Sequence, residues 1–372
     1  MSQRRFRRKV EQLLADTGIR VDGREAWDLK VHDARVFGRV LAHGSLGLGE
    51  SYMDGWWDAE DLDGFACRLM LADIEEHVHS WDDILHVLHA RLTNLQKPSR
   101  AFEVGQRHYD MGNALYKRML DRRMIYSCGY WKQADTLDAA QEAKLELIFR
   151  KLGLTAGMRV LDIGCGWGGA LRLAAERYGI EGVGITVSEQ QAQYARESCR
   201  GLPVDIRLQD YRLLDEKFDR IFSVGMFEHV GSRNYRTYMQ VARRCLKPDG
   251  LFLLHCIGNN YSVRTTDAWI ARYIFPNGML PSIRQIGSAI EHLFVMEDWH
   301  NFSAHYDRTL MAWRGNFEAH WDELKQEYGT MFYRMWRYYL SVSAASFRAR
   351  KAQLWQIVLS PRGVPGGYES LR

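Results

Sequence analysis

Apolar positions follow two different patterns along the chain. In residues 33–45 and 80–95 they recur three and four residues apart, which is the spacing of an amphipathic helix. From about residue 136 onward, short and nearly continuous apolar runs alternate with helical segments. Runs of that kind are typical of strands in a parallel sheet that is covered by helices on both faces. We therefore expect a small, mainly helical N-terminal region followed by an α/β domain.

The α/β part predicts one leading helix and then a series of strands. The helix covers residues 135–154, where Asp135 or Thr136 can serve as the N-cap. Strand, glycine turn and helix follow one another in residues 158–179. Further strands are predicted within the segments 181–199, 204–212, 217–231, 250–258, 294–302 and 353–361. A long helical insert rich in aromatic residues, about 306–350, separates the last two.

Glycines interrupt the sequence in residues 44–57, GSLGLGESYMDGWW. A phosphate-binding loop would need a preceding strand and a following Lys-Ser or Lys-Thr pair, and neither is present. Gly44 suits the end of the preceding helix, and the rest of the segment predicts a tight turn that leads into an aromatic segment. The sequence LQKPSR at 95–100 is typical of a hinge. We place the domain boundary there, with a helical domain at 1–100 and the α/β domain at 101–372.

The composition is that of an ordinary globular protein. Apolar residues make up 46% and charged residues 26% of the chain, and the net charge of +4 is too small for a nucleic-acid binder. Five of the first nine residues are basic, so this end can attract an anionic surface or remain a solvated terminus. No apolar run reaches the length of a membrane span, and the first segment is too polar for a signal peptide. These features predict a cytoplasmic protein.

Cysteine and histidine positions argue against disulfides and metal binding. The six cysteines have no paired spacing, as expected for reduced thiols in a cytoplasm. Four histidines cluster without cysteines or carboxylates at ligand spacing, so they predict solvated helix positions and no metal site. The histidines of this cluster are His77, His79, His86 and His89.

A glycine turn follows the first strand of the α/β part. Residues 160–169 read VLDIGCGWGG, and Gly164, Gly166 and Gly168 allow the backbone to pass close beneath a ligand. In an open parallel sheet, ligands bind beyond the carboxyl ends of the strands, and this turn lies there. Such a glycine pattern alone would also fit a nicotinamide or flavin site. Asp162, inside the strand end, is a further candidate for the same site.

The next two strands indicate which cofactor the turn serves. The second strand ends at Thr186, near Gln190 and Gln191, without the acidic residue that a dinucleotide ribose requires. Asp210, which is expected to end the third strand, can face an adenine edge, and Tyr211 can lie flat beside it. Together with the glycine turn, these residues favour S-adenosylmethionine over NAD.

Polar residues also end the fourth and fifth predicted strands. Glu228 and His229 are expected at the end of the fourth strand and His255 at the end of the fifth, at the ligand edge of the sheet. Polar residues at strand ends can also simply cap neighbouring loops, and for His229 both interpretations stay open. For Glu228 we favour a role toward the substrate.

Several motifs together resemble those of the cyclopropane fatty acid synthase and mycolic acid cyclopropane synthase family. The resemblance covers essentially the whole chain, and its N-terminal hundred residues match the phospholipid branch and not the shorter mycolic branch. GMFEHVG together with YIFPNG is specific to this family. The matching motifs are GSLGLGESYMDGWW, HYDMGN, YSCGYW, VLDIGCGWGG, ITVSEQQ, LQDYR, VGMFEHVG, YIFPNG and FRARKAQLWQ.

The resemblance implies a reaction and a base. The reaction adds a methylene group from S-adenosylmethionine across a cis double bond of a phospholipid acyl chain, through a carbocation that must lose a proton. The base implied is a bound bicarbonate ion, held by Cys128, Glu228, His255 and Tyr306 and by the backbone of Ile257. Apolar and aromatic walls suit such a cation, whereas a strong nucleophile beside it would be alkylated. Two alternatives remain: a methyl- or methylene-branched product, and a lipid-binding protein without catalysis.

The resemblance also implies the residues around the cofactor. Tyr126 and Ser127 lie on one side of it, the glycine turn lies beneath, and further residues reach the ribose, the methionine portion and the adenine. The expected cofactor-binding residues are Tyr126, Ser127, Asp162, Gly164, Cys165, Gly166, Gly168, Thr186, Gln191, Asp210, Tyr211 and Arg212.

Cys128 belongs to the segment MIYSCGYW, which precedes the leading helix of the α/β part. A metal site is excluded by the lack of partner ligands, and a covalent nucleophile is disfavoured beside a cation. Burial as a small core residue stays open. We favour a role as one wall of an anion-binding cup.

A phospholipid substrate implies contact with a membrane. Because no segment spans one, we expect peripheral docking on the inner face. The candidate contacts are the basic N-terminus, the aromatics of residues 51–58 and the segment 332–351, which mixes basic and aromatic residues. The alternative is that these aromatics belong to the core. The resemblance also implies a homodimer joined partly through the small domain.

Overall fold

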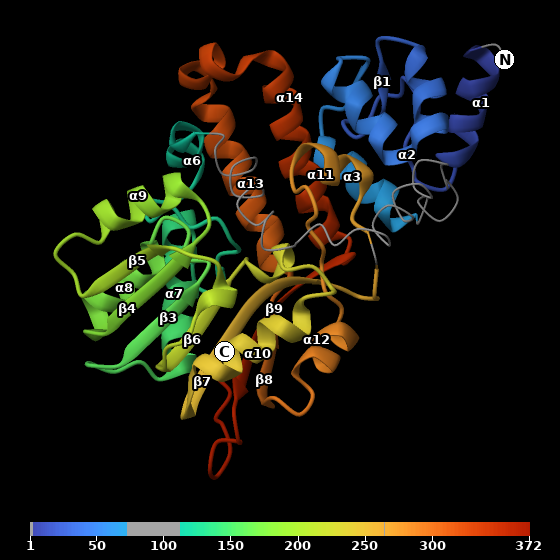
Figure 1. Cartoon of the computed structure of the whole chain (residues 1–372). Helices are drawn as coiled ribbons and strands as arrows, with labels where there is room; N and C mark the ends of the chain where they lie inside the picture. Colours follow the sequence, from blue (N-terminus) through green and yellow to red (C-terminus); the bar gives the residue numbers. More distant parts are fainter. Residues whose placement is uncertain (1–2, 73–111, 264) are drawn as a thin grey trace. The chain divides into compact units, whose positions relative to one another are not determined.

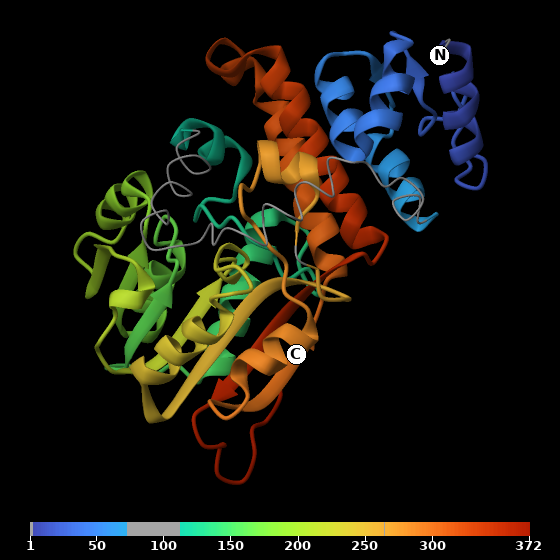
Figure 2. The ribbon, with the colours of Figure 1, turned by 45° about the vertical axis from the view of Figure 1, so that its right-hand side comes forward.

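The computed structural model describes residues 3–72, 112–263 and 265–372 (Figures 1 and 2). The predicted helix at 80–95, the hinge at 95–100 and the four clustered histidines lie outside the described residues. The chain forms two compact units. Unit 1 consists of Met1–Thr93, Arg264–Pro276 and Tyr306–Ala352, and unit 2 consists of Asn94–Val263, Asn277–His305 and Gln353–Arg372.

Unit 2 is built on a seven-stranded sheet with the order β5-β4-β3-β6-β7-β9-β8. The strands from β5 to β7 pair in parallel, and β8 pairs antiparallel with β9, so the predicted, mostly parallel sheet is confirmed. The strands are β3 Arg159–Ile163, β4 Glu181–Thr186, β5 Val204–Leu208, β6 Phe218–Val224, β7 Leu246–Asn259, β8 Val295–Asn301 and β9 Ala352–Ser360.

Helices cover both faces of this sheet, as the apolar runs predicted. One buried cluster joins the sheet to α7, α8 and α9, and the other joins it to α10 and α12 (Figure 1). Neighbouring residues of β3 point to opposite faces, so Val160 packs in the first cluster and Leu161 in the second. The helices are α6 Asn113–Met119, α7 Leu137–Leu152, α8 Gly169–Tyr178, α9 Glu189–Ser198, α10 Tyr235–Cys245 and α12 Ile283–Ile290.

Helix α7 has the N-cap that the sequence suggested. The Oγ1 atom of Thr136 accepts a hydrogen bond from the backbone N–H of Ala139 at 3.2 Å, and Gly153 ends the helix in a left-handed conformation. The cap is therefore Thr136 and not Asp135.

Three polar residues expected at strand ends lie elsewhere. β6 ends at Val224, so Glu228 and His229 lie beyond it in a short 3₁₀ helix, η4 Phe227–His229. Gly225, with a φ of 69°, turns the chain away from the sheet between the end of β6 and the start of η4. His255 lies inside β7, because this strand continues to Asn259. The prediction that His255 ends its strand is therefore wrong, because β7 continues past this buried polar residue.

Asp210 also lies past its strand. β5 ends at Leu208, and the side chain of Asp210 caps a second 3₁₀ helix, η3 Tyr211–Leu213, by accepting a hydrogen bond from the N–H of Arg212. The carboxylate thus serves the turn that follows the strand.

Unit 1 combines helices from three separate segments of the chain (Figure 2). Helix α14 packs along α3 and α2, so the aromatic segment predicted as an insert contacts helices near the start of the chain. A kink at Gly329 interrupts α14. The elements are α1 Gln3–Leu13, β1 Lys30–Val31, α2 Arg35–Met53, β2 Trp57–Asp58, α3 Leu62–Leu71, α11 Ala268–Tyr273, α13 Ala304–Ala319 and α14 Trp321–Arg348.

The glycine-rich segment of unit 1 is helical and not a tight turn. The helix does break at Gly44, as predicted, but it resumes and runs on to Met53. Two glycines in the resumed part are sites of close packing. A Cβ atom at Gly49 would lie 2.4 Å from the Trp269 ring, and one at Gly47 would lie 2.4 Å from the carbonyl oxygen of Arg39.

Many of the aromatics considered as membrane contacts form the core of unit 1. Tyr52 and Trp57 are fully buried, their ring centroids lie 5.1 Å apart, and both rings contact Tyr338. Trp336, Tyr339 and Phe347 are buried as well. None of the described helices is both long and apolar enough to cross a membrane.

Candidate active site

A cavity of about 170 Å³ lies at the carboxyl ends of consecutive strands in unit 2. Asp162 from β3, Thr186 from β4, Asp210 after β5 and Gly225 after β6 all line it. Parallel strands bring their carboxyl ends to one edge of a sheet, which is why residues so far apart in sequence meet here. The segment Met124–Ser127 forms another wall.

Most of the expected cofactor-binding residues line this cavity. Gly168 does not line it, because it caps α8, where a Cβ atom would lie 3.0 Å from Ala195. The expected residues that line it are Tyr126, Ser127, Asp162, Gly164, Cys165, Gly166, Thr186, Gln191, Asp210, Tyr211 and Arg212.

The glycine turn has the backbone that its sequence requires. Gly164 and Gly166 have φ values of 92° and 54°, which side chains rarely adopt. No atom lies within 4 Å of a Cβ placed on Gly166, so this part of the turn is open toward the cavity. The turn therefore combines a left-handed conformation with room for a ligand close to the backbone.

A hydrogen-bonded pair forms the wall after β4. The Thr186 hydroxyl donates to Oε1 of Gln191 at 2.9 Å, and both residues are buried. Ser188 caps α9 by accepting a hydrogen bond from the backbone N–H of Gln191. The Gln191 amide is thus held in place at the cavity, where its NH₂ group can serve as a donor.

The wall after β5 consists of Asp210, Tyr211 and Arg212. The carboxylate of Asp210 accepts hydrogen bonds from the backbone N–H, Nε and Nη2 of Arg212, each at 2.9 Å. Arg212 thereby neutralises the charge of Asp210 within the wall. Burial raises the pKa of Tyr211 to about 12, so this ring is a neutral, flat surface at neutral pH.

Two titratable lining residues go beyond the sequence prediction. His229, whose role was left open, lines the cavity, and burial lowers its pKa to about 4, which keeps the imidazole neutral. Lys144 of α7 also lines the cavity and was missed. Its signal was present in the sequence, because a lysine occurs on the apolar face of the predicted helix.

A second group of polar residues is centred on β7. Oε1 of Glu228 accepts a hydrogen bond from the backbone N–H of Ile257 at 2.6 Å. His255 and Ile257 lie two residues apart on one strand, so their side chains share a face. Three of the five residues expected to hold bicarbonate therefore lie close together.

Two atoms of this group have no hydrogen-bond partner among the described residues: Oε2 of Glu228 and Nε2 of His255, both buried. Nδ1 of His255 lies 3.3 Å from Nε2 of Gln356, which can only donate, so Nδ1 accepts and Nε2 carries the hydrogen. Burial raises the pKa of Glu228 to about 7 and lowers that of His255 well below its ordinary value. The group thus offers one buried donor and one buried acceptor.

The other two residues expected at the bicarbonate site, Cys128 and Tyr306, belong to different units. Cys128 is fully buried in unit 2, and its thiol donates to the carbonyl oxygen of Gly129 at 3.2 Å. Tyr306 belongs to unit 1, where its ring lies 4.6 Å from Phe347 and 6.0 Å from Trp313, measured between centroids. Its role in the cup stays a prediction.

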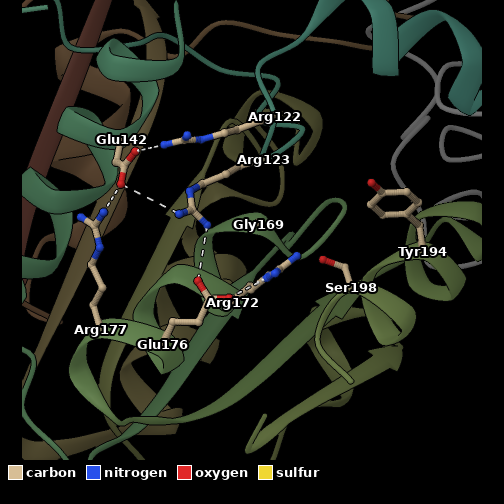
Figure 3. A pocket seen from close by; sticks show the side chains of 9 residues that line it. All are labelled: Arg122, Arg123, Glu142, Gly169, Arg172, Glu176, Arg177, Tyr194 and Ser198. Atoms are coloured by element: carbon tan, nitrogen blue, oxygen red, sulfur yellow. Dashed lines mark hydrogen bonds and ion pairs between the residues drawn. The ribbon is translucent and has the colours of Figure 1, made fainter. Parts of the chain in front are cut away.

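A larger hollow of about 420 Å³ in unit 2 has a different character (Figure 3). Its arginines pair with two glutamates: Arg122 Nη2 lies 2.5 Å from Oε2 of Glu142, and Arg172 Nε lies 2.7 Å from Oε1 of Glu176. Arg177 also pairs with Glu142. This hollow is thus lined by arginine–glutamate ion pairs, unlike the cavity at the strand ends.

Comparison with known proteins agrees with this geometry. The family model described as mycolic acid cyclopropane synthetase matches residues 96–357. The cyclopropane-fatty-acyl-phospholipid synthase of Escherichia coli K12 is 53% identical over 98% of this chain and 96% of its own length. Cyclopropane mycolic acid synthase 2 of Mycobacterium leprae is 35% identical over 69% of this chain and 93% of its own.

Solved structures show the same fold. The cyclopropane synthase MmaA2 from Mycobacterium tuberculosis has a TM-score of 0.66 and 32% identity, covering 72% of this chain and 99% of that one. The mycolic acid cyclopropane synthase CmaA1, solved as a complex with SAH and CTAB, has a TM-score of 0.66 and 31% identity, covering 69% of this chain and 97% of that one. The chain therefore belongs to the mycolic acid cyclopropane synthetase family.

Proposed function

We propose that the protein is a cyclopropane-fatty-acyl-phospholipid synthase. It would transfer a methylene group from S-adenosylmethionine to a cis double bond in an unsaturated phospholipid acyl chain. The observation that carries the proposal is the 53% identity over nearly the full length to a relative of that name, combined with the cavity at the strand ends. That match covers 98% of this chain, whereas cyclopropane mycolic acid synthase 2 of Mycobacterium leprae covers 69% of it.

The cavity fits S-adenosylmethionine by its chemistry. It combines the open backbone at Gly166, the buried NH₂ donor of Gln191, which Thr186 holds in place, and the flat face of Tyr211. Oδ1 of Asp162 is buried without a partner among the described residues, which leaves an acceptor for the ammonium group of the cofactor. When bound, the cofactor supplies an electrophilic methyl group.

The second polar group fits a bicarbonate ion. Bicarbonate has one O–H group and several acceptor oxygens, which complement the orphan acceptor of Glu228 and the orphan donor of His255. Because both side chains are buried, the ion would be shielded from water and could act as a weak base. Cys128 and Tyr306 would complete the cup, as the family resemblance implies.

Aromatic side chains in unit 2 would help to tolerate a carbocation. The Phe302 ring lies 5.2 Å from Tyr130 and 5.9 Å from His255, measured between centroids. The negative faces of such rings stabilise a nearby positive charge without bonding to it. A lysine or thiolate at that place would instead trap the cation.

The location and assembly of the enzyme are part of the same proposal. A phospholipid substrate lies in a bilayer, so we infer peripheral docking on the inner face of the membrane by a cytoplasmic homodimer. The support is the basic start of the chain and the resemblance to the phospholipid branch. Co-sedimentation with anionic and with neutral vesicles measures the docking, and analytical ultracentrifugation measures the assembly.

Lipid mass spectrometry tests the reaction directly. The purified protein is incubated with S-adenosylmethionine and vesicles of a cis-unsaturated phospholipid. We expect each modified chain to gain the mass of one CH₂ group and to resist ozone, because its double bond is lost. A gain in mass with the double bond retained would identify a methylene-branching enzyme, and no gain would support the lipid-binding alternative.

The matched variant for this assay is Glu228→Gln. Its loss of an acceptor for the bicarbonate O–H should reduce ring formation by about 100-fold or more, a range typical of lost acid–base function. Cofactor affinity, measured by calorimetry, should change less than about two-fold, because Glu228 does not line the cofactor cavity. Equal losses in activity and in cofactor affinity would contradict the assignment.

A further inference from the structure

Lys144 of α7 is a buried lysine in the wall of the cofactor cavity. Its side chain has no exposed surface, and its Nζ atom donates a hydrogen bond to Oγ of Ser127 at 2.9 Å. Within the described part of the chain, its ammonium group forms no ion pair with a carboxylate. A buried cation in that state is costly, which raises the question of what compensates for it.

Lys151 provides a comparison on the same helix. It is equally buried, two turns further along α7, but Nζ lies 3.4 Å from Oδ2 of Asp298 and 3.1 Å from Nδ1 of His300. The fold therefore supplies Lys151 with an anionic partner of its own. It supplies Lys144 only with a hydroxyl group and an adjacent cavity.

The hydrogen bond between Lys144 and Ser127 has a fixed direction. An ammonium group has only donors, so Oγ of Ser127 accepts and the hydroxyl hydrogen of Ser127 remains available to another acceptor. Gln141, one turn before Lys144, holds the same segment by donating to the carbonyl oxygen of Ser127 at 2.7 Å. Helix α7 thus sets both the position and the donor direction of Ser127 at the cavity.

We propose that Lys144, together with the Ser127 hydroxyl that it orients, binds the carboxylate of the methionine portion of S-adenosylmethionine. That carboxylate is the only anionic group of the cofactor, and Lys144 is the one buried cation among the described residues that line the cavity without an ion pair. The inference rests on the cofactor part of the proposed function. It does not depend on the lipid substrate or on bicarbonate.

The surroundings of Lys144 give the inference a pH dependence. The charged or titratable groups that act on it are Asp121, Cys128 and Asp162, and it acts in turn on His255. Burial, partly offset by these acidic groups, lowers the pKa of Lys144 to about 8, and burial raises that of Asp162 to about 8. An anionic ligand favours the protonated lysine, so cofactor affinity should fall as the pH rises above about 8.

Calorimetry with two ligands tests the role of Lys144. The variant Lys144→Met should bind S-adenosylmethionine about 10- to 100-fold more weakly than the wild type, as expected for the loss of a charged hydrogen bond. Decarboxylated S-adenosylmethionine, which keeps the ammonium and adenosine groups, should bind both proteins within about two-fold. A purely structural role for Lys144 would weaken both ligands equally, and that result would overturn the inference.

The pH profile gives a second measurement on the same proteins. The ratio of wild-type to variant affinity should decrease from pH 7 toward pH 9.5, since only the wild type loses a cation there. Taking the ratio cancels the titration of the cofactor's own amino group. A ratio that does not change with pH would contradict the inference.

Two further variants serve as controls. Lys151→Met changes a lysine that already has its own partner, so it should leave cofactor affinity within about two-fold. Lys144→Gln repeats the two-ligand test if the methionine variant does not fold, as judged by circular dichroism. If the wild type itself failed to bind S-adenosylmethionine, the proposed function would fall, whereas equal weakening of both ligands would overturn only the role of Lys144.

Discussion

At the scale of single residues, the polar group around β7 contains the carboxyl group of Glu228 and the imidazole of His255. Burial favours the uncharged form of both. Glu228 and His255 both lose most of their contact with water, and their pKa values move in opposite directions as a result. A carboxyl group that holds a proton reduces the repulsion that an anion would otherwise meet, and the neutral imidazole can still donate its Nε2 hydrogen to the anion. The same burial should make the free energy of unfolding depend on pH.

The stability of the protein should depend on the protonation of Glu228. Its pKa is about 7 in the folded state and about 4.5 ordinarily, so between these values the folded state holds a proton that the unfolded state has lost. Stability from this residue is therefore present at low pH and is lost as the pH rises from about 4.5 through about 7, by on the order of 3 kcal/mol.

Urea unfolding of the wild type and of Glu228→Gln, each at pH 5 and pH 7.5, measures this contribution. The variant should gain stability relative to the wild type at the higher pH, because glutamine has no proton to lose. Asp162 is also affected by burial, but both proteins retain it, so it cancels. A constant difference between the two proteins at both pH values would show that Glu228 ionises normally.

At the scale of elements, helix α2 shows that glycines can serve packing inside a helix. Because a Cβ at Gly49 would lie 2.4 Å from Trp269, Gly49→Ala should destabilise the protein by about 1–3 kcal/mol, as overpacking does. Gly315→Ala in α13 is the matched control, since no atom lies within 4 Å of its Cβ, and it should be neutral or slightly stabilising. Urea denaturation measures both, and equal effects would contradict this account.

These elements also show what the sequence can and cannot predict. The central strands of unit 2, such as β3, β6 and β9, could be predicted because each contains a short apolar run. The role of Gly49 inside a helix could not be predicted, because the side chain that packs against it is a tryptophan more than two hundred positions later in the chain. His255 was placed wrongly for a similar reason, since neighbouring strands determine how far β7 extends.

The candidate site shows the same limit. Residues within sequence motifs, such as Gly164, Thr186 and Tyr211, could be placed at the cavity in advance. Lys144 could not, because the pattern of α7 shows only that a lysine lies on an apolar face and not what that face meets. Motifs identify the residues of a turn, whereas tertiary packing decides which helix supports them.

At the scale of the molecule, buried ion pairs in unit 1 connect helices that lie far apart in the sequence. Asp63 of α3 lies 2.7 Å from Nη1 of Arg314 in α13 and 2.8 Å from Nη1 of Arg348 in α14. Arg348 also pairs with Asp307 at 2.9 Å. Because the carboxylate of Asp63 is buried between two helices, it connects three elements that the sequence keeps far apart.

Removing the carboxylate of Asp63 should destabilise unit 1. We expect Asp63→Asn to lower the free energy of unfolding by about 2–3 kcal/mol, since it leaves the buried guanidinium of Arg314 with less compensation. Asp322→Asn breaks an exposed pair with Lys325 in the same unit and should cost less than about 1 kcal/mol. Thermal unfolding followed by circular dichroism compares them, and similar losses would mean that the Asp63 pairs contribute little.

Strand β9 is the last strand of unit 2 to be synthesised, although it lies inside the sheet. It lies between β7 and β8, all nine of its residues are buried, and it is synthesised only after the whole of α11 to α14. Until β9 emerges, the nascent sheet has β7 as an open edge, and an open apolar edge pairs readily with other chains. The growing polypeptide should therefore depend on chaperones, and a chain cut before residue 352 should aggregate instead of folding.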